Sequence, residues 1–133
     1  MIELVVINNT MGQLPTIPNH LRKIDLSGSG FSGPICIATL LSTCTNLNEL
    51  LLNNMPSGVA ITEDCLGSNP PLQLLELKSN HLDDNDAEVL ASSLKTNTHL
   101  HTLVIGGNSF SKVAEDAFIK AICFSNVLQL FLC

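Results

Sequence analysis

The chain has 133 residues, about the length of one domain. It is 45% hydrophobic and 14% charged, and its six Lys and Arg against twelve Asp and Glu give a formal net charge of −6. This composition excludes disorder, because disordered chains are poor in apolar residues and rich in charge. Six scattered cations cannot form the basic surface that binds nucleic acid, and the apolar runs are far shorter than the roughly 18 residues of a membrane span.

The five cysteines indicate the compartment. Their number is odd and they form no CxxC pair, which favours thiols in a reducing environment. No basic segment followed by an apolar one opens the sequence, as a secretory signal would. We therefore expect a cytoplasmic protein.

One pattern, L-x-x-L-x-L-x-x-N-x-L, recurs along the chain. Its copies start at residues 1, 21, 47, 72, 100 and 127, separated by 20, 26, 25, 28 and 27 residues. The copy at 72–82 fits at every position, whereas Ser29 and Met55 take the asparagine place in the second and third copies. The apolar positions of the first and last copies hold Met1, Leu4, Val6, Met11, Val127, Leu130 and Leu132. Repetition at such a period is typical of stacked repeat architectures.

Each copy predicts a short strand followed by a turn. Leu75 and Leu77 are two residues apart, as are Leu103 and Ile105, and this spacing points one row of strand side chains inward. The asparagine three residues later can pair its amide with the backbone of the turn and of neighbouring coils. The replacements Ser29 and Met55 predict looser turns in the earlier coils.

Helical patterns follow the strands, in chain order over residues 35–43, 59–66, 84–94 and 113–122. The first begins just after Pro34, and the second is the weakest. The third is the clearest, because its apolar residues fall at i, i+3, i+4 and i+7, its first turn is acidic and Lys95 lies at its end. In the fourth we expect an apolar face of Val113, Ala117, Phe118, Ala121 and Ile122.

The segment 80–100, from Asn80-His-Leu82 to Thr98-His-Leu100, resembles a full repeat of the ribonuclease-inhibitor-like class of leucine-rich repeat proteins. The resemblance covers nearly the whole chain and implies an α/β solenoid of about five coils over residues 1–133. Parallel strands would line its concave face, with helices on its convex face. It also implies binding of other proteins, usually inside cells.

Residues 66–70, 94–98 and 102–105 are similar to repeats of the capping protein, Arp2/3 and myosin-I linker family of actin regulators. Ran GTPase-activating protein shares related repeats. No segment here matches the capping-protein-binding region of the linker family, and no position matches a functional motif of the Ran-type activator. An actin-regulatory scaffold and a small-GTPase activator remain alternatives to a general interaction module.

Residues that could carry chemistry lack the required partners in the sequence. His99 and His101 could share one side of a strand, but no third ligand accompanies them at zinc-site spacing. Counted as a calcium loop from Asp84, the sixth and twelfth positions hold Val89 and Lys95 instead of Gly and Glu. The acidic run is better explained as helix capping, and Gly106-Gly107 as a turn. We expect no enzyme, no metal and no cofactor.

Binding remains the functional interpretation. Residues between the buried leucines should form three columns on the concave side, with Leu51, Leu74, Val104 and Phe131 as exposed apolar residues. The expected partner-binding residues are Lys23, Asp25, Glu49, Leu51, Asn53, Leu74, Glu76, Lys78, Thr102, Val104 and Phe131. An exposed apolar cluster with scattered charges suggests a protein partner, and the acidic balance favours a basic one. The alternative is that missing parts of the same chain cover the cluster, since neither end shows a polar cap and the sequence reads as a piece of a longer repeat protein.

Overall fold

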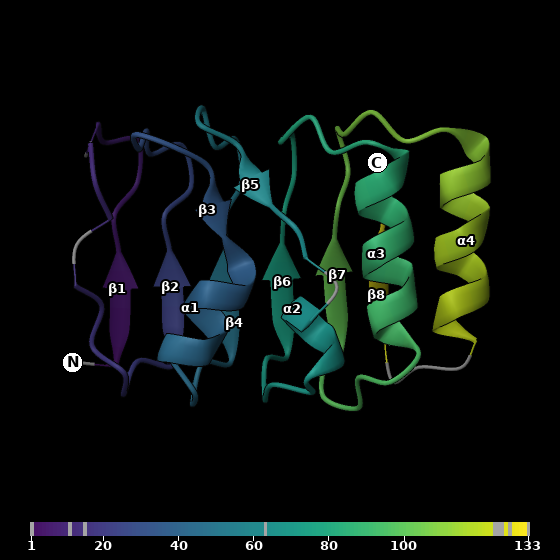
Figure 1. The fold of residues 1–133 in the computed structure, drawn as a ribbon, viewed down its shortest axis with the longest axis horizontal. Helices are drawn as coiled ribbons and strands as arrows, with labels where there is room; N and C mark the ends of the chain where they lie inside the picture. The colour runs from purple at the N-terminus through teal and green to yellow at the C-terminus, as the bar shows by residue number, and fades with distance from the viewer. Residues whose placement is uncertain are drawn as a thin grey trace.

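The computed structural model describes residues 2–10, 12–14, 16–62, 64–123, 127 and 129–132, without the side chains of Asp64 and Phe131. Met1, Met11 and Cys133, which the repeat pattern and the cysteine count include, lie outside these residues. Within them the fold is mixed α/β, with a six-stranded parallel sheet in the order β1-β2-β4-β6-β7-β8 (Figure 1). Its strands are β1 (Glu3–Val5), β2 (Lys23–Asp25), β4 (Glu49–Leu51), β6 (Leu74–Glu76), β7 (Thr102–Val104) and β8 (Gln129–Phe131).

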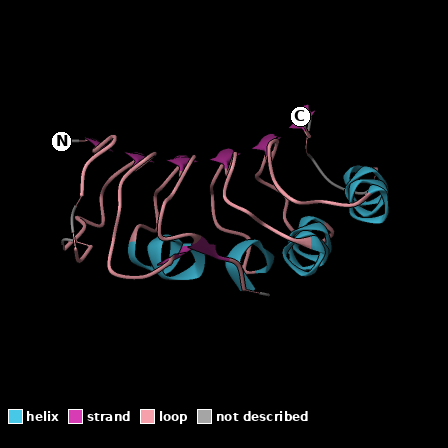
Figure 2. Cartoon of the chain, turned by 90° about the horizontal axis from the view of Figure 1, so that it is seen from above, coloured by secondary structure: helices cyan, strands magenta, loops and turns pink. Residues whose placement is uncertain are grey.

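The helices of the described residues lie on one side of this sheet. They are α1 (Ile37–Thr43), α2 (Asp64–Gly67), α3 (Asp84–Leu94) and α4 (Lys112–Ile122). Figure 2 shows the strands along one edge of the molecule and the helices along the other. The row of strands bends away from the helices at both ends, so the opposite face of the sheet is concave.

Two segments with helical patterns begin as strands instead. Ile35–Cys36 forms β3 and Val59–Ala60 forms β5, and the two pair in parallel among the helices (Figure 2). The predictions of helices over 35–43 and 59–66 are therefore wrong at their starts. The physical reason is that the two dipeptides pair with each other, a contact that no local periodicity reveals.

The repeated leucines form the core between sheet and helices. Leu75, Leu77, Leu103 and Ile105 are fully buried, which confirms the predicted inward row. Their side chains stack because the strands pair in register, with Leu75 opposite Leu103 and, on its other side, Leu50. Burial of each such side chain contributes about 1.5–3 kcal/mol.

Two asparagines of the repeat tie successive turns together. Asn80 Oδ1 accepts a hydrogen bond from the backbone N–H of Met55 at 2.8 Å, and its Nδ2 donates to the carbonyl of Leu52 at 2.6 Å. Asn108 Oδ1 likewise accepts from the N–H of Asn80 at 2.8 Å, and its Nδ2 donates to the carbonyl of Leu77 at 2.9 Å. The predicted structural role of these asparagines is confirmed.

Ser29 makes the same kind of link with a shorter side chain. It is fully buried; its Oγ donates to the carbonyl of Val6 at 2.9 Å and accepts from the N–H of Asn9 at 3.3 Å. The expected looser turn is therefore wrong at Ser29, because a hydroxyl both donates and accepts as an amide does. Met55, which has no such group, is buried in the core instead.

A stack of left-handed residues follows the strands. Asn8, Gly28, Asn54, Ser79 and Gly107 have φ of 56, 73, 51, 56 and 68°, and each lies three residues beyond the end of its strand. The turns thus repeat one geometry. At Gly107 an added Cβ would lie 2.6 Å from Ser79 Oγ, so that hydroxyl would have to move.

The acidic run caps α3, as predicted. Asp83 is the N-cap and accepts from the N–H of Asp86, whose carboxylate accepts from the N–H of Asp83 in return, forming a capping box. Asp84 reaches the N-cap of α4, where its Oδ1 accepts from the N–H of Ser111 at 2.9 Å and its Oδ2 from the hydroxyl. Hydrogen bonds from the Ser111 side chain, and then from its backbone, lower the pKa of Asp84, whereas burial raises the pKa of Asp86.

α4 differs from its predicted phase. Val113 is 77% exposed, while Ala114, Phe118 and Ala121 are buried. The expected place of Val113 on the apolar face is therefore wrong. The inward stripe runs through 114, 118 and 121, spaced by four and three residues as on one helix face, and Val113 lies outside it and faces solvent.

No helix within the described residues is both long and apolar enough to cross a membrane. The four described cysteines, Cys36, Cys44, Cys65 and Cys123, are thiols. Burial raises the pKa of the Cys44 thiol, while Cys123 is exposed at the end of α4.

Candidate functional site

The face of the sheet away from the helices carries two columns of side chains in strand register. The first column contains Glu3, Lys23, Glu49, Leu74, Thr102 and Gln129. The second contains Val5, Asp25, Leu51, Glu76, Val104 and Phe131, whose side chain lies outside the described part of the structure. The alternation of strand side chains places these residues opposite the buried leucines. Both columns are as the sequence predicts.

The third expected column follows the ends of the strands. The backbone N–H of Gly28 donates to the backbone carbonyl of Asn53. In the same way, the N–H of Asn54 donates to the carbonyl of Lys78, and the N–H of Ser79 to that of Gly106. These bonds extend the strand register through Ser27, Asn53, Lys78 and Gly106.

Asn53 does not present its amide to solvent. It is only 9% exposed; its Nδ2 donates to Glu76 Oε1 at 2.8 Å, and its Oδ1 accepts from the N–H of Lys78 at 2.8 Å. Sequence reasoning placed Asn53 among the partner-binding residues. Its geometry instead makes it an internal support that holds the Glu76 carboxylate.

The apolar residues of this face differ in exposure from the expectation. Leu51, Leu74 and Val104 are half-buried rather than open. The larger exposed areas belong to Val5 and Ile7, which are 50% and 46% exposed at the β1 end of the face. The expected binding residues omit both, although their alternation with the partly buried Leu4 and Val6 indicated their exposure.

Three carboxylates surround Leu51. Asp25 and Glu76 are its partners on the two neighbouring strands, and Glu49 precedes it by two residues on β4. Neighbouring strands lie about 4.8 Å apart and alternate residues about 6.6 Å apart, so Leu51 is the centre of an acidic ring. Lys23 lies beside Glu49 and Lys78 follows Glu76. Asp25 Oδ1 also accepts from the N–H of Ser27 at 3.1 Å, which fixes this carboxylate.

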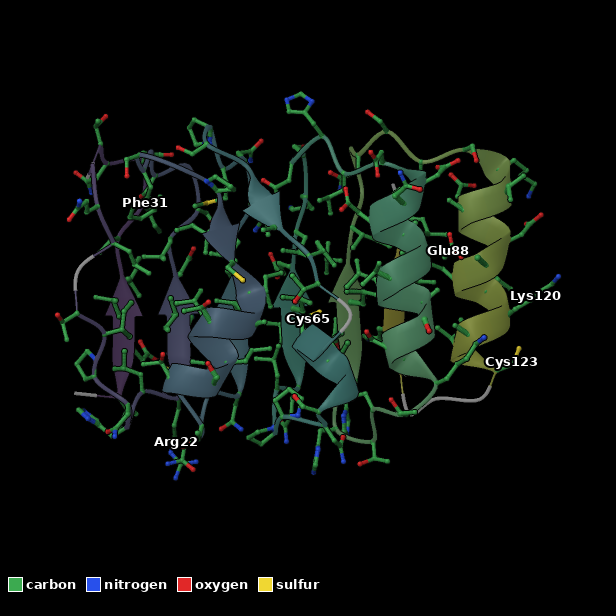
Figure 3. All side chains as sticks on the ribbon, in the orientation of Figure 1. Arg22, Phe31, Cys65, Glu88, Lys120 and Cys123 are labelled. Carbon is green, nitrogen blue, oxygen red and sulfur yellow. The ribbon has the colours of Figure 1, made fainter. Side chains whose placement is uncertain are left out.

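A polar row borders the face where the strands begin. Arg22, Asn48, Gln73 and His101 are consecutive in it, because each backbone N–H donates to the carbonyl of the residue before it in the row. Arg22 projects beyond the start of β2 (Figure 3), and its guanidinium donates to Asn48 Oδ1 at 3.5 Å. This row supplies hydrogen-bonding groups at the edge of the concave face.

His99 and His101, which we expect to bind no metal, lie at this same edge. His99 Nδ1 lies 3.1 Å from Asn69 Oδ1, and His101 Nδ1 lies 2.6 Å from the carbonyl of His99. Over the described residues, the structure brings together no group of three or more His, Cys, Asp or Glu that could hold a metal ion. The rings are thus engaged with backbone and amide groups.

Three hollows lie on the helix side of the sheet. One of about 580 Å³ follows α3 on its α2 side, and one of about 410 Å³ lies between α3 and α4. A third, of about 220 Å³, lies near Phe31 and β3. The half-buried side chains of the sheet face are spread over neighbouring strands, as in a surface that binds a macromolecule.

No protein-family model matches this sequence, and no curated protein matches it. The resemblance to ribonuclease-inhibitor-like repeats therefore depends on the repeat pattern alone.

Proposed function

We propose that this chain is a leucine-rich-repeat solenoid that acts, without catalysis, as a protein-interaction module. Six strands pair in the order of the repeat, and the asparagine positions link one turn to the next. These features support successive coils stacked around one apolar spine. Buried thiols such as Cys44 support a reducing, cytoplasmic location for it.

The partner would bind the concave face of the sheet. The described helices cover the other face (Figure 2), while the first two columns leave half-buried apolar and charged side chains accessible. Interfaces combine apolar anchors with a polar rim in this way. The observation that carries the proposal is the column Asp25, Leu51, Glu76 and Val104, in register across four strands and opposite the core.

The chemistry of this face favours a partner with basic and apolar side chains. The expected partner-binding residues include three carboxylates, Asp25, Glu49 and Glu76, and two lysines, and Glu3 adds a fourth carboxylate at β1. A lysine or arginine side chain from a partner could lay its alkyl stem on Leu51 and its charge among the carboxylates. Each such contact at a protein surface contributes about 0.2–1 kcal/mol, and more if water is excluded.

The test replaces the centre of the face. The double variant Leu51→Asp, Leu74→Asp should lose partner capture from cytosolic extract, measured by quantitative cross-linking mass spectrometry against the wild-type chain. The control is Val113→Asp, which places a single aspartate on α4 where the side chain is 77% exposed, and it should keep the captured set.

The outcome is interpretable only if both variants fold, which circular dichroism and thermal unfolding establish. The half-buried positions of Leu51 and Leu74 allow an aspartate carboxylate to remain hydrated. A folded double variant that captures the same proteins as the control would contradict a binding role for this face. If acidic proteins dominated the captured set, the expected preference for a basic partner would be contradicted, while the binding role of the face would stand.

A further inference from the structure

The helix side carries a groove between α3 and α4 that the proposed function does not use. It has a volume of about 410 Å³. Its α3 wall is formed by Glu88, Ala91, Ser92 and Lys95, and its α4 wall by Ala117, Lys120 and Ala121. Because the floor side chains Ala91 and Ala121 are short and buried, a third helix can approach the pair closely.

The charged residues of this groove are ordered along the helices, with the acidic residue nearer the start of α3 and the basic residues near the ends of α3 and α4. Glu88 lies in the first half of α3, Lys95 directly follows that helix, and Lys120 lies near the end of α4; Figure 3 shows Glu88 and Lys120 on the two helices. In the described part of the chain the ion pair that forms on these helices joins Lys112 and Asp116, at 3.4 Å. The three groove charges are therefore not paired with one another within one copy.

We propose that the groove receives α3 of a second copy of this chain, in an antiparallel, two-fold symmetric dimer. A two-fold interface must be complementary to itself, and this patch satisfies that condition. Glu88 and Lys95 are seven residues apart, about 10 Å along the helix. A two-fold axis at the level of Ser92 therefore brings Glu88 of each copy opposite Lys95 of the other, with Lys120 on the α4 wall of the same groove.

Shape supports the same arrangement. Glu88, Ser92 and Lys95 are exposed and form the outward ridge of α3, while the groove beside them has alanines at its base. When the α3 of one copy lies over the groove of the other, the symmetry places both ridges in both grooves at once. The concave face points the other way, so dimerisation leaves the proposed partner site accessible and the two proposals fail independently.

The test is a charge-swap experiment by sedimentation equilibrium, from about 10 µM to about 500 µM in low salt. The wild-type chain should show a monomer–dimer equilibrium. Glu88→Lys alone, and Lys95→Glu with Lys120→Glu, should each weaken self-association by roughly tenfold or more, because attraction becomes repulsion at both symmetric contacts. The control Lys112→Glu, on α4 outside the groove, should dimerise like the wild type.

The decisive sample is the mixture of the two charge variants. Each repels itself, but together they restore both opposite-charge contacts, so the mixture should form a heterodimer. A wild-type chain that stays monomeric over the whole range would overturn the proposal. This is the result expected if the groove binds another protein instead of a second copy. Self-association that is insensitive to both variants, or a mixture that remains monomeric, would overturn it as well.

Discussion

Replacing Asn80 with alanine should destabilise the chain more than any surface substitution. The Asn80 side chain is 5% exposed and holds two backbone groups of the preceding coil, the N–H of Met55 at 2.8 Å and the carbonyl of Leu52 at 2.6 Å. Alanine removes both partners, so the two backbone groups lose their hydrogen bonds inside the folded chain.

The magnitude follows from these two groups. A buried backbone donor or acceptor without a partner costs about 1–3 kcal/mol, so the variant should lose about 2–6 kcal/mol. Domains are stable by only about 5–15 kcal/mol, so the loss is a large fraction of the total. With a urea slope of about 2 kcal/mol per molar, the unfolding midpoint should fall by about 1–3 M.

Urea unfolding followed by circular dichroism measures this loss, with Asn85→Ala as the matched control. Asn85 is exposed in the first turn of α3, where alanine is the better helix former, so that variant should be neutral or slightly more stable. Amide exchange adds a local measurement, because the N–H of Met55 should lose protection in the Asn80 variant. Equal midpoints for the two variants would refute the argument that the asparagine ladder stabilises the stacked turns.

Three further changes test other parts of the structure. Gly107→Ala should cost about 1–2 kcal/mol in thermal unfolding, because its φ is 68° and the added Cβ meets a serine hydroxyl of the neighbouring turn; unchanged stability would contradict the left-handed turn. The pKa of Asp84 is lower in the folded chain than its ordinary value of 3.8, so ionised Asp84 stabilises the fold. This stabilisation is complete when the pH is above 3.8 and is lost as the pH falls through the lower pKa of the folded chain. The stability difference between wild type and Ser111→Ala should therefore shrink in this acid range, and a constant difference would exclude the linkage. In the folded chain Cys123 should react with a thiol reagent long before Cys44, whose thiol is buried and has a raised pKa; equal rates would contradict this burial.

The sheet was predictable because its signal repeats. The two-residue spacing of Leu75 and Leu77, found again at Leu103 and Ile105, fixes which side chains point inward. Strands pair at the same position of each copy, although the copies are 20 to 28 residues apart. α3 was predictable for a local reason, since Asp83 and Asp86 form a capping box at the start of an apolar stripe.

The failures come from contacts between coils. β3 and β5 are two residues long, too short for periodicity, and exist because they pair with each other. Val113 was placed inside because valine is apolar, whereas the packing of Ala114, Phe118 and Ala121 against the core turns it outward. The exposure of Leu51 depends on how closely neighbouring side chains cover it, which strand alternation does not specify.

The central claim, that the repeats stack as parallel strands in a single register, is tested most directly by NMR couplings across backbone hydrogen bonds. The account predicts couplings from the N–H of Leu52 to the carbonyl of Glu76 and from the N–H of Leu77 to the carbonyl of Val104, at N···O distances of 2.9 and 2.7 Å. Couplings of these amides to carbonyls four residues earlier, or to a strand in a shifted register, would contradict it.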